Sequence, residues 1–238
     1  MKLNYETCIV GKKCILVPYR PEHVGKYHEW MRDPKLLEAT GSEPMTLEEE
    51  IENQQSWRDD NSKCTFIVLA REDCLPGDHY IENQIKGDFV VRNLDAMVGD
   101  VNLFLSDEED EDEEDNVLSD PPNASQSECN VALKHSEVDI MIAEKDKQGQ
   151  GIGWEATCLM MLYGAKMLGI RRFFAKINED NAASLNLFTK KLGFHQREYI
   201  VVFKQYELDL KKETNREMIE ALTNAVGELQ TFSCPITE

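Results

Sequence analysis

Short runs of apolar, β-branched residues, bounded by polar or helix-breaking residues, recur along the first half of the chain. Such runs are typical of buried strands, because branched side chains pack well on a pleated surface. They predict strands over residues 13–17, 64–70 and 97–105, and a shorter one over residues 89–91. Pro18 ends the first strand, since proline has no N–H to donate to a neighbouring strand.

Two segments between these strands show the three- and four-residue spacing of apolar positions that is typical of helices. One begins at Pro21 and closes at Asp33–Pro34. The other begins at Thr46, which forms a capping box with Glu49. We expect the packed face of this second helix to comprise Leu47, Ile51, Gln54 and Trp57.

The second half of the chain alternates predicted strands and helices. Strands are predicted over residues 137–142, 173–177 and 198–210, the last segment holding one or two of them. Helices are predicted over residues 152–168 and 184–192, and a glycine follows each as a helix stop. A tail helix from Thr214 places on one face Met218, Ile219, Leu222, Ala225 and Val226. We interpret that face as packing back on the domain, with the binding of a partner as the alternative.

The composition changes abruptly after residue 105, because residues 107–115 are nine consecutive acids. Like charges repel, and such a segment buries no apolar surface, which predicts a disordered loop over residues 106–130. The remaining pattern indicates one domain over residues 1–210, followed by an amphipathic helix and tail over residues 211–238. Recruitment of a basic partner by the acidic loop is a further hypothesis.

The net charge is −19 and the pI is near 4.7. An acidic surface repels nucleic acid and anionic membranes, so neither is expected as a partner, whereas a basic partner or substrate is easily accommodated. The seven cysteines lack C-x-x-C spacing and the five histidines show no ligand spacing, so neither disulfides nor a metal site is predicted. No apolar run suits a signal peptide or a spanning helix. We expect a monomer in the cytoplasm, with the nucleus as a second location.

The stretch from Gln148 to Gly153 carries three glycines between a predicted strand and a predicted helix. Glycines in such number are explained if the backbone turns tightly and brings its N–H groups close to a ligand. The helix start adds unpaired N–H groups and the positive end of a dipole, which suits a pyrophosphate. A P-loop would need lysine and serine or threonine after Gly151, and a dinucleotide fingerprint needs a third glycine at an offset where this chain has none.

Gln148, Gly151 and Gly153 match the pattern Q-x-x-G-x-G, which resembles the coenzyme A pyrophosphate loop of the GNAT acyltransferases. The later segment 181–194, which begins Asn181-x-x-Ser184, resembles the second cofactor-contacting helix of that family. Residues 26–31, residues 46–50 and the acidic insert are similar to those of the N-acetyltransferase 9-like group. The resemblance implies an α/β fold with a mixed, mostly antiparallel sheet, splayed central strands and helices on both faces. It also implies acetyl-CoA as cosubstrate.

The same resemblance assigns roles to residues. It implies that the cofactor is bound by Met141, Ile142, Ala143, Gln148, Gly149, Gln150, Gly151, Ile152, Gly153, Asn181 and Ser184. Backbone N–H groups of residues 141–143 are implied to face the thioester carbonyl and the pantetheine arm.

Three side chains are candidates for a more specific role. Glu137 is the first choice for a general base, because the polar face of its strand carries it together with Asp139; a solvated surface carboxylate is the alternative. Ser184 is expected either to hydrogen-bond or protonate the sulfur, or to cap its helix. Asn181 is expected to bond the pantetheine or to act as an N-cap.

Two positions depart from the family pattern. Phe188 stands where many relatives have a tyrosine that protonates the thiolate, and Lys176 stands where some have a glutamate base. The leading hypothesis is acetylation of a protein N terminus, with tubulin as the substrate that the resemblance suggests. The alternatives are a non-catalytic binding protein of this fold associated with microtubules, and an acetyltransferase for a small polyamine, which a charge of −19 attracts.

Overall fold

The computed structural model describes residues 1–75, 80–81, 84–85, 88–106 and 134–235. Its strands are β1 (Thr7–Val10), β2 (Cys14–Pro18), β3 (Lys63–Ala70), β4 (Tyr80–Ile81), β5 (Gln84–Ile85), β6 (Met97–Ser106), β7 (Lys134–Ile142), β8 (Ile170–Asn178), β9 (His195–Ile200), β10 (Gln205–Lys211) and β11 (Thr231–Ser233). Its α-helices are α1 (Val24–Trp30), α2 (Pro34–Thr40), α3 (Leu47–Asp59), α4 (Phe89–Arg92), α5 (Ile152–Tyr163), α6 (Ala182–Asn186) and α7 (Asn215–Val226). Single π-helical turns, Gly164–Leu168 and Leu187–Lys191, extend α5 and α6.

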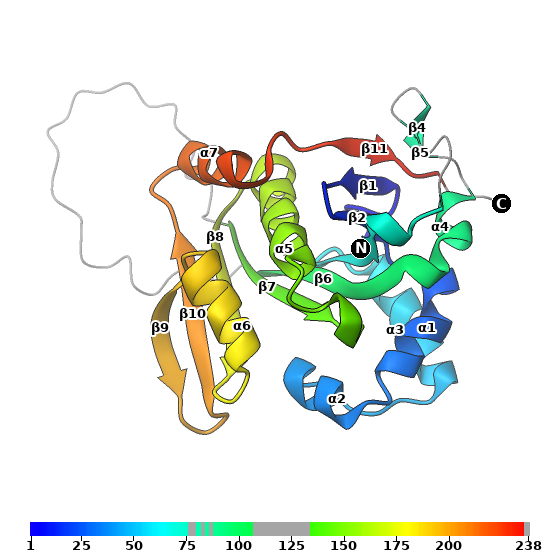
Figure 1. Cartoon of the computed structure of the whole chain (residues 1–238). Coiled ribbons are helices and arrows are strands. Elements are labelled where there is room, and N and C mark those ends of the chain that lie inside the picture. The colour runs from blue at the N-terminus through cyan, green and yellow to red at the C-terminus, as the bar shows by residue number, and fades with distance from the viewer. Residues whose placement is uncertain (76–79, 82–83, 86–87, 107–133, 236–238) are drawn as a thin grey trace, which may run out of the picture.

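The described strands form one sheet in the order β4-β5-β11-β1-β2-β3-β6-β7-β8-β10-β9 (Figure 1). Neighbouring strands run antiparallel except β7 with β8 and β5 with β11. The pairing of β7 with β8 extends only as far as Glu137 and Phe174, beyond which the two strands separate. The predicted mixed, mostly antiparallel sheet with splayed central strands is therefore confirmed.

The sheet separates two hydrophobic cores. One lies beneath α5 and α7 and contains Phe66 and Phe173; the other is covered by α1 and α4 and contains Ile67 and Met97. Successive residues of a strand face opposite sides, so Val138 and Ile140 of β7 enter the first core and Met141 enters the second. Asp139 therefore points toward the helices α1 and α3.

Local patterns predicted most elements of the first half, but one detail was incomplete and two were wrong. Asp33 accepts a hydrogen bond from the N–H of Lys35 and Pro34 occupies the first turn, so this pair begins α2 as well as ending the segment before it. On α3, Gln54 and Trp57 face inward as predicted, but Leu47 and Ile51 are 43% and 40% exposed, because Glu50 takes the other inward position. Residues 89–91 belong to α4 and not to a strand.

The second half follows the predicted order. Gly169 ends the long helix in a left-handed conformation with φ of 72°, and the tail helix is present as α7, capped by Thr214. α7 packs beside α5, and β11 then joins the sheet next to β1 (Figure 1). The predicted disordered loop lies outside the described residues, except for Ser106, which ends β6. No helix in the described part of the chain is long and apolar enough to cross a membrane.

The tail helix should contribute to the stability of the whole domain. Met218 is fully buried against the first core, whereas Asn224 on the same helix is exposed. Met218→Ala removes buried apolar volume and should lower the free energy of unfolding by about 2–3 kcal/mol. Asn224→Ala, as the matched control, should change it by less than about 0.5 kcal/mol. Urea unfolding measures both, and equal midpoints for the two variants would show that α7 is not part of the cooperative unit.

Candidate active site

A cavity of about 470 Å³ opens where β7 and β8 separate. Its walls are residues 138–142 of β7, residues 175–177 of β8, the loop before α5, α6 with its π-helical extension, and Leu36, Ala39 and Thr40 of α2. The splayed strands expose main chain that would be paired in a continuous sheet, so the cavity offers backbone donors and acceptors as well as side chains.

The loop between β7 and α5 has the conformation that its glycines allow. Gly149 and Gly151 have φ of 75° and 86°, in the left-handed region that side chains disfavour, and Gly151 is the N-cap of α5. A Cβ on Gly153 would lie 3.3 Å from the side chain of Ile142, so this glycine lets α5 approach β7 closely. The first turn of a 12-residue helix thus points unpaired N–H groups at the mouth of the cavity.

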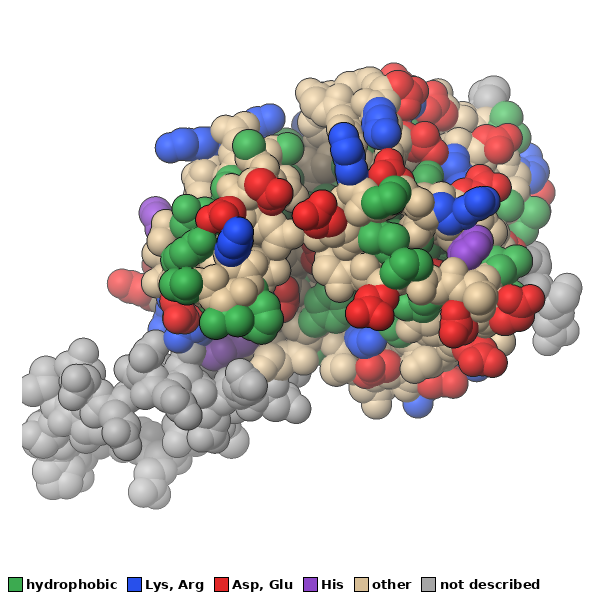
Figure 2. All heavy atoms as spheres, turned by 90° about the horizontal axis from the view of Figure 1, so that it is seen from below, with side chains coloured by type: hydrophobic (Ala, Val, Ile, Leu, Met, Phe, Trp, Pro, Cys, Tyr) green, Lys and Arg blue, Asp and Glu red, His purple; other side chains and the backbone are tan. Residues whose placement is uncertain are grey.

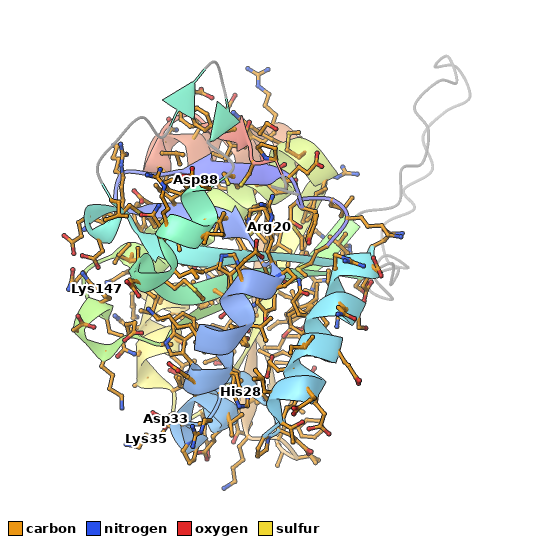
Figure 3. All side chains as sticks on the ribbon, turned by 90° about the vertical axis from the view of Figure 1, so that its right-hand side faces the viewer. Arg20, His28, Asp33, Lys35, Asp88 and Lys147 are labelled. Atoms are coloured by element: carbon orange, nitrogen blue, oxygen red, sulfur yellow. The ribbon has the colours of Figure 1, made fainter. Side chains whose placement is uncertain are left out.

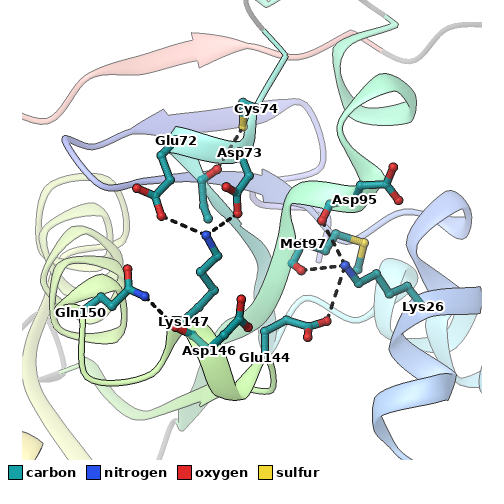
Figure 4. A network of polar contacts seen from close by, with 11 residues as sticks. Lys26, Glu72, Asp73, Cys74, Asp95, Met97, Glu144, Asp146, Lys147 and Gln150 are labelled. Atoms are coloured by element: carbon teal, nitrogen blue, oxygen red, sulfur yellow. Dashed lines mark hydrogen bonds and ion pairs between the residues drawn. The ribbon is translucent and has the colours of Figure 1, made fainter.

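Side chains on both sides hold this loop in place (Figure 4). Lys147 pairs with Asp73 at 2.6 Å and with Glu72 at 2.9 Å, and these bonds raise the pKa of its ammonium group. Gln150 donates from Nε2 to the carbonyl of Asp146 at 2.6 Å. Because Lys147 is committed to two carboxylates, it is a structural anchor and not a free cation for a ligand.

Hydrogen bonding within the sheet corrects the predicted set of backbone donors. The N–H of Ala143 donates to the carbonyl of Val98 at 2.8 Å, so it is not available to a ligand. Because successive N–H groups of a strand point to opposite sides, the N–H of Met141 also points toward β6, and that of Ile142 points into the cavity. Gln148 confirms this orientation, since its Nε2 donates at 2.7 Å to the carbonyl of Ile142.

On α6 the structure separates the roles of Asn181 and Ser184. Asn181 is the N-cap, and its Oδ1 accepts from the N–H of Ser184 at 3.1 Å. The capping function expected of Ser184 is therefore carried out by Asn181, and Ser184 is one of the residues that line the cavity. Phe188 also lines the cavity and packs edge-on against Phe194, with ring centroids 5.0 Å apart.

Most of the predicted site residues converge on this cavity, and four do not. The residues that line it are Met141, Ile142, Gln148, Gly149, Gly151, Gly153, Asn181 and Ser184. Ile152 is buried in the first core, Gln150 faces the loop, Ala143 pairs with β6, and Glu137 lies at the closed end of the strand separation.

The chain matches the family described as "Acetyltransferase (GNAT) domain" over residues 13–195. It is 45% identical to an N-acetyltransferase 9-like protein of Caenorhabditis briggsae, over 90% of each chain. It is 38% identical to the Homo sapiens protein named alpha/beta-tubulin-N-acetyltransferase 9, over 96% of this chain and 95% of that one. The chain belongs to the GNAT acetyltransferase family. Among solved structures, spermidine N-acetyltransferase from Vibrio cholerae, crystallised with CoA and spermine, superposes with a TM-score of 0.58 at 14% identity, covering 86% of this chain and 98% of that one.

GNAT enzymes use acetyl-CoA, and the residues of this cavity fit that molecule. The glycine turn and the start of α5 would hold the pyrophosphate, and Lys191 is a further cationic residue that lines the cavity. The N–H of Ile142 would face the pantetheine arm or the thioester carbonyl. Bound there, acetyl-CoA supplies an acetyl group on a thiolate leaving group.

Among the described residues, the acidic residue that lines the cavity is Asp139. Glu137 does not line the cavity; it lies 3.6 Å from Nζ of Lys176, and burial raises the pKa of its carboxyl. Asp139 lines the cavity, accepts from the N–H of Ile140 at 2.8 Å, and has a pKa that burial raises. The role of base that the sequence gives to Glu137 therefore suits Asp139 better.

Sequence reasoning missed the residues that stand behind Asp139. Asp100 and Asn102 occupy alternate positions of β6, and Asn102 is directly opposite Asp139. The sequence feature that could have revealed them is a pair of polar residues two positions apart in an apolar strand, since such residues share one face of the strand. Without the strand order, that face could not be matched to the one that carries Asp139.

Proposed function

We propose that this acetyltransferase acts on the α-amino group of a protein N terminus, with tubulin as the acceptor. The proposal rests on the relatives, among which the human and mouse proteins are named alpha/beta-tubulin-N-acetyltransferase 9 at 38% and 37% identity over nearly the whole chain. Tubulin is a cytosolic protein, so we also propose the cytoplasm as the site of action.

The surroundings of the cavity near α2 and the end of β8, which we call the acceptor side, support a protein as the acceptor. α2 lines the cavity, and Nδ2 of Asn178 at the end of β8 donates to the carbonyl of Glu38 on α2 at 3.0 Å, so the two elements meet across this side. Hydrophobic side chains gather in two groups on the face seen in Figure 2. The turn between β9 and β10 exposes the apolar side chains of Val201, Val202 and Phe203. This turn lies beside the end of β8, because the N–H of Glu179 donates to the carbonyl of Lys204. Such surface suits a protein acceptor.

Different residues of the chain take different roles in the reaction. The glycine turn and Ile142 orient the acetyl donor, and Asp139 meets the acceptor nitrogen. Ser184 lines the cavity and its hydroxyl can donate to the departing sulfur, whereas Phe188 has no proton to give. Most of the rate enhancement then comes from placing amine and carbonyl together, which is worth up to about 7–11 kcal/mol in well-oriented systems.

One assay tests the proposed acceptor. Purified full-length protein is incubated with acetyl-CoA and, in parallel, with peptides carrying tubulin N termini, with the same peptides blocked at the α-amino group, and with spermine. The release of free thiol is followed, and the masses of the products are measured by mass spectrometry. We expect thiol release and a one-acetyl mass gain only with the unblocked peptides. Release with spermine alone would favour a polyamine acetyltransferase, and CoA binding without any release would favour a non-catalytic binding protein.

A further inference from the structure

The exposed part of the glycine turn (residues 148–153) is not held by packing. Residues 148–150 are exposed, and a Cβ added to Gly149 would meet no atom within 4 Å. Gly149 and Gly151 have positive φ, and glycine has the widest choice of backbone conformations. Unless contacts from outside hold such a turn, it has the cofactor-binding conformation for only part of the time, and the apparent affinity falls with that fraction.

The contacts that hold the turn are polar and come from three directions. Gln148 donates from Nε2 to the carbonyl of Ile142 on β7 at 2.7 Å. Nζ of Lys13, in the turn between β1 and β2, donates to the carbonyl of Gln150 at 2.5 Å. The third contact is made by Lys147, the residue that precedes the glycine turn. Each contact reaches a different neighbouring element, so together they restrict the backbone of the turn.

Lys147 is held by two acids that follow β3. Its side chain is 15% exposed, and its Nζ lies 2.6 Å from Asp73 and 2.9 Å from Glu72 (Figure 4). The side chain of Lys145 is 78% exposed, and its Nζ lies 3.4 Å from Asp33. Lys147 and Asp33 lie apart in Figure 3, so the two lysines anchor the segment before the glycine turn in different places. Lys147 makes the shorter contacts and is the less exposed of the two.

The two acids lie on a support that is itself fixed. They belong to a 3₁₀ turn over residues 71–73, directly after β3. The N–H and the guanidinium of Arg71 donate to carbonyls of the turn between β1 and β2, at 2.8 and 2.6 Å. On the other side, the N–H of Leu75 donates at 2.7 Å to Oδ1 of Asn93, which is buried. The acids can therefore transmit the position of the sheet to Lys147.

The charge of these acids is opposite to what an anionic cofactor would attract. By electrostatics alone Glu72 and Asp73 disfavour CoA, and they also occupy Lys147, a cationic residue that lines the cavity. We propose that Glu72 and Asp73 are positioning residues for acetyl-CoA. By holding Lys147 they keep the glycine turn in the conformation that binds the diphosphate, and so they raise the affinity for the cofactor in spite of their charge.

This role in binding should be separable from the stability of the domain. The side chains of Glu72 and Asp73 are 64% and 40% exposed. Exposed ion pairs contribute little to the free energy of unfolding, so the urea midpoints of variants at these positions should stay close to that of the wild type. A change in CoA affinity can then be assigned to the turn and not to unfolding.

Calorimetric titration of the full-length protein with CoA tests the proposal. Glu72→Gln/Asp73→Asn should bind CoA at least about threefold more weakly than the wild type, and Lys147→Gln should lose a similar factor. Two controls remove charge from the same exposed segment without touching the contact: Lys145→Gln removes a positive charge and Asp146→Asn a negative one. Both should bind CoA within about twofold of the wild type, because exposed charges are screened.

The sign of the change in Glu72→Gln/Asp73→Asn is decisive. Loss of two negative charges and release of Lys147 should both tighten CoA binding if charge alone matters, so a gain in affinity, or a loss smaller than threefold, would overturn the proposal. Equal losses in Lys147→Gln and Lys145→Gln would overturn it as well. Lys147→Glu/Asp73→Lys reverses the contact and keeps the net charge, so it should bind CoA more tightly than Lys147→Glu alone; no recovery would show that the contact does not hold the turn.

Nitrogen-15 relaxation of the free protein gives a second measurement, without CoA or acceptor. The amides of Gly149 and Gly151 should have order parameters near the rigid value of about 0.85 in the wild type and clearly lower ones in Glu72→Gln/Asp73→Asn. The amide of Gly169, at the far end of the helix, should be the same in both. Equal order parameters at the two turn glycines would overturn the proposal. Neither measurement involves an amine, so the outcome is independent of whether a protein N terminus is the acceptor.

Discussion

Gly151→Asp is expected to weaken CoA binding by at least about 100-fold, or about 2.7 kcal/mol, in a calorimetric titration. Gly151 has φ of 86°, and a Cβ there would lie 3.2 Å from Nζ of Lys13. The aspartate therefore strains the turn and places a carboxylate at the start of α5, where it competes with the pyrophosphate for the same N–H groups. The loss of CoA affinity should exceed that caused by removing any single side chain in the cavity, because backbone N–H groups form the site.

Gly169→Asp is the matched control for backbone strain. Gly169 has φ of 72°, and no atom lies within 4 Å of its added Cβ, at the far end of the same long helix. It should lose stability as Gly151→Asp does and keep wild-type affinity for CoA. Circular dichroism confirms that both variants are folded. Unchanged affinity in Gly151→Asp, or an equal loss in the two variants, would remove the glycine turn from the cofactor site.

The cofactor half of the site could be predicted from sequence because it is local. Gly149, Gly151 and Gly153 report backbone conformations directly, and a strand before them and a helix after them fix where the N–H groups point. The splay of β7 and β8 was implied by the resemblance alone, since no residue in either strand encodes where pairing stops.

The acceptor half could not be predicted because it depends on tertiary contacts. Asp139 lies opposite Asn102 only through the pairing of β6 with β7, and the choice of Glu137 followed from one strand considered by itself. Glu50 occupies an inward position of α3 that the apolar spacing assigned to Ile51, because the surface it faces is polar. The donor role given to Ala143 failed for the same reason, since its hydrogen bond to Val98 is made across strands.

Glu155→Ala is expected to lower the free energy of unfolding by about 3–5 kcal/mol, more than any other substitution considered for stability. The Glu155 side chain on α5 is buried and accepts hydrogen bonds from three backbone N–H groups of the turn between β1 and β2. These come from Lys12 at 3.1 Å, Lys13 at 2.7 Å and Cys14 at 3.0 Å. Removing the carboxylate leaves all three N–H groups without this acceptor, and the N–H of Cys14 is buried, where water cannot replace it.

The same carboxylate also links the fold to the site. Nζ of Lys13 donates at 2.5 Å to the carbonyl of Gln150, so a loosened turn should release the cofactor loop, and CoA affinity should fall together with stability. Glu155→Gln keeps the volume but turns an amide toward one donor, so its loss should be smaller, about 2–3 kcal/mol. Glu220→Gln is the control, because its pair with Arg216 at 2.8 Å is exposed and should be worth under about 0.5 kcal/mol. Equal urea midpoints for Glu155→Ala and Glu220→Gln would contradict this prediction. They would show that the three N–H groups find other partners in solution, and that α5 does not hold this turn.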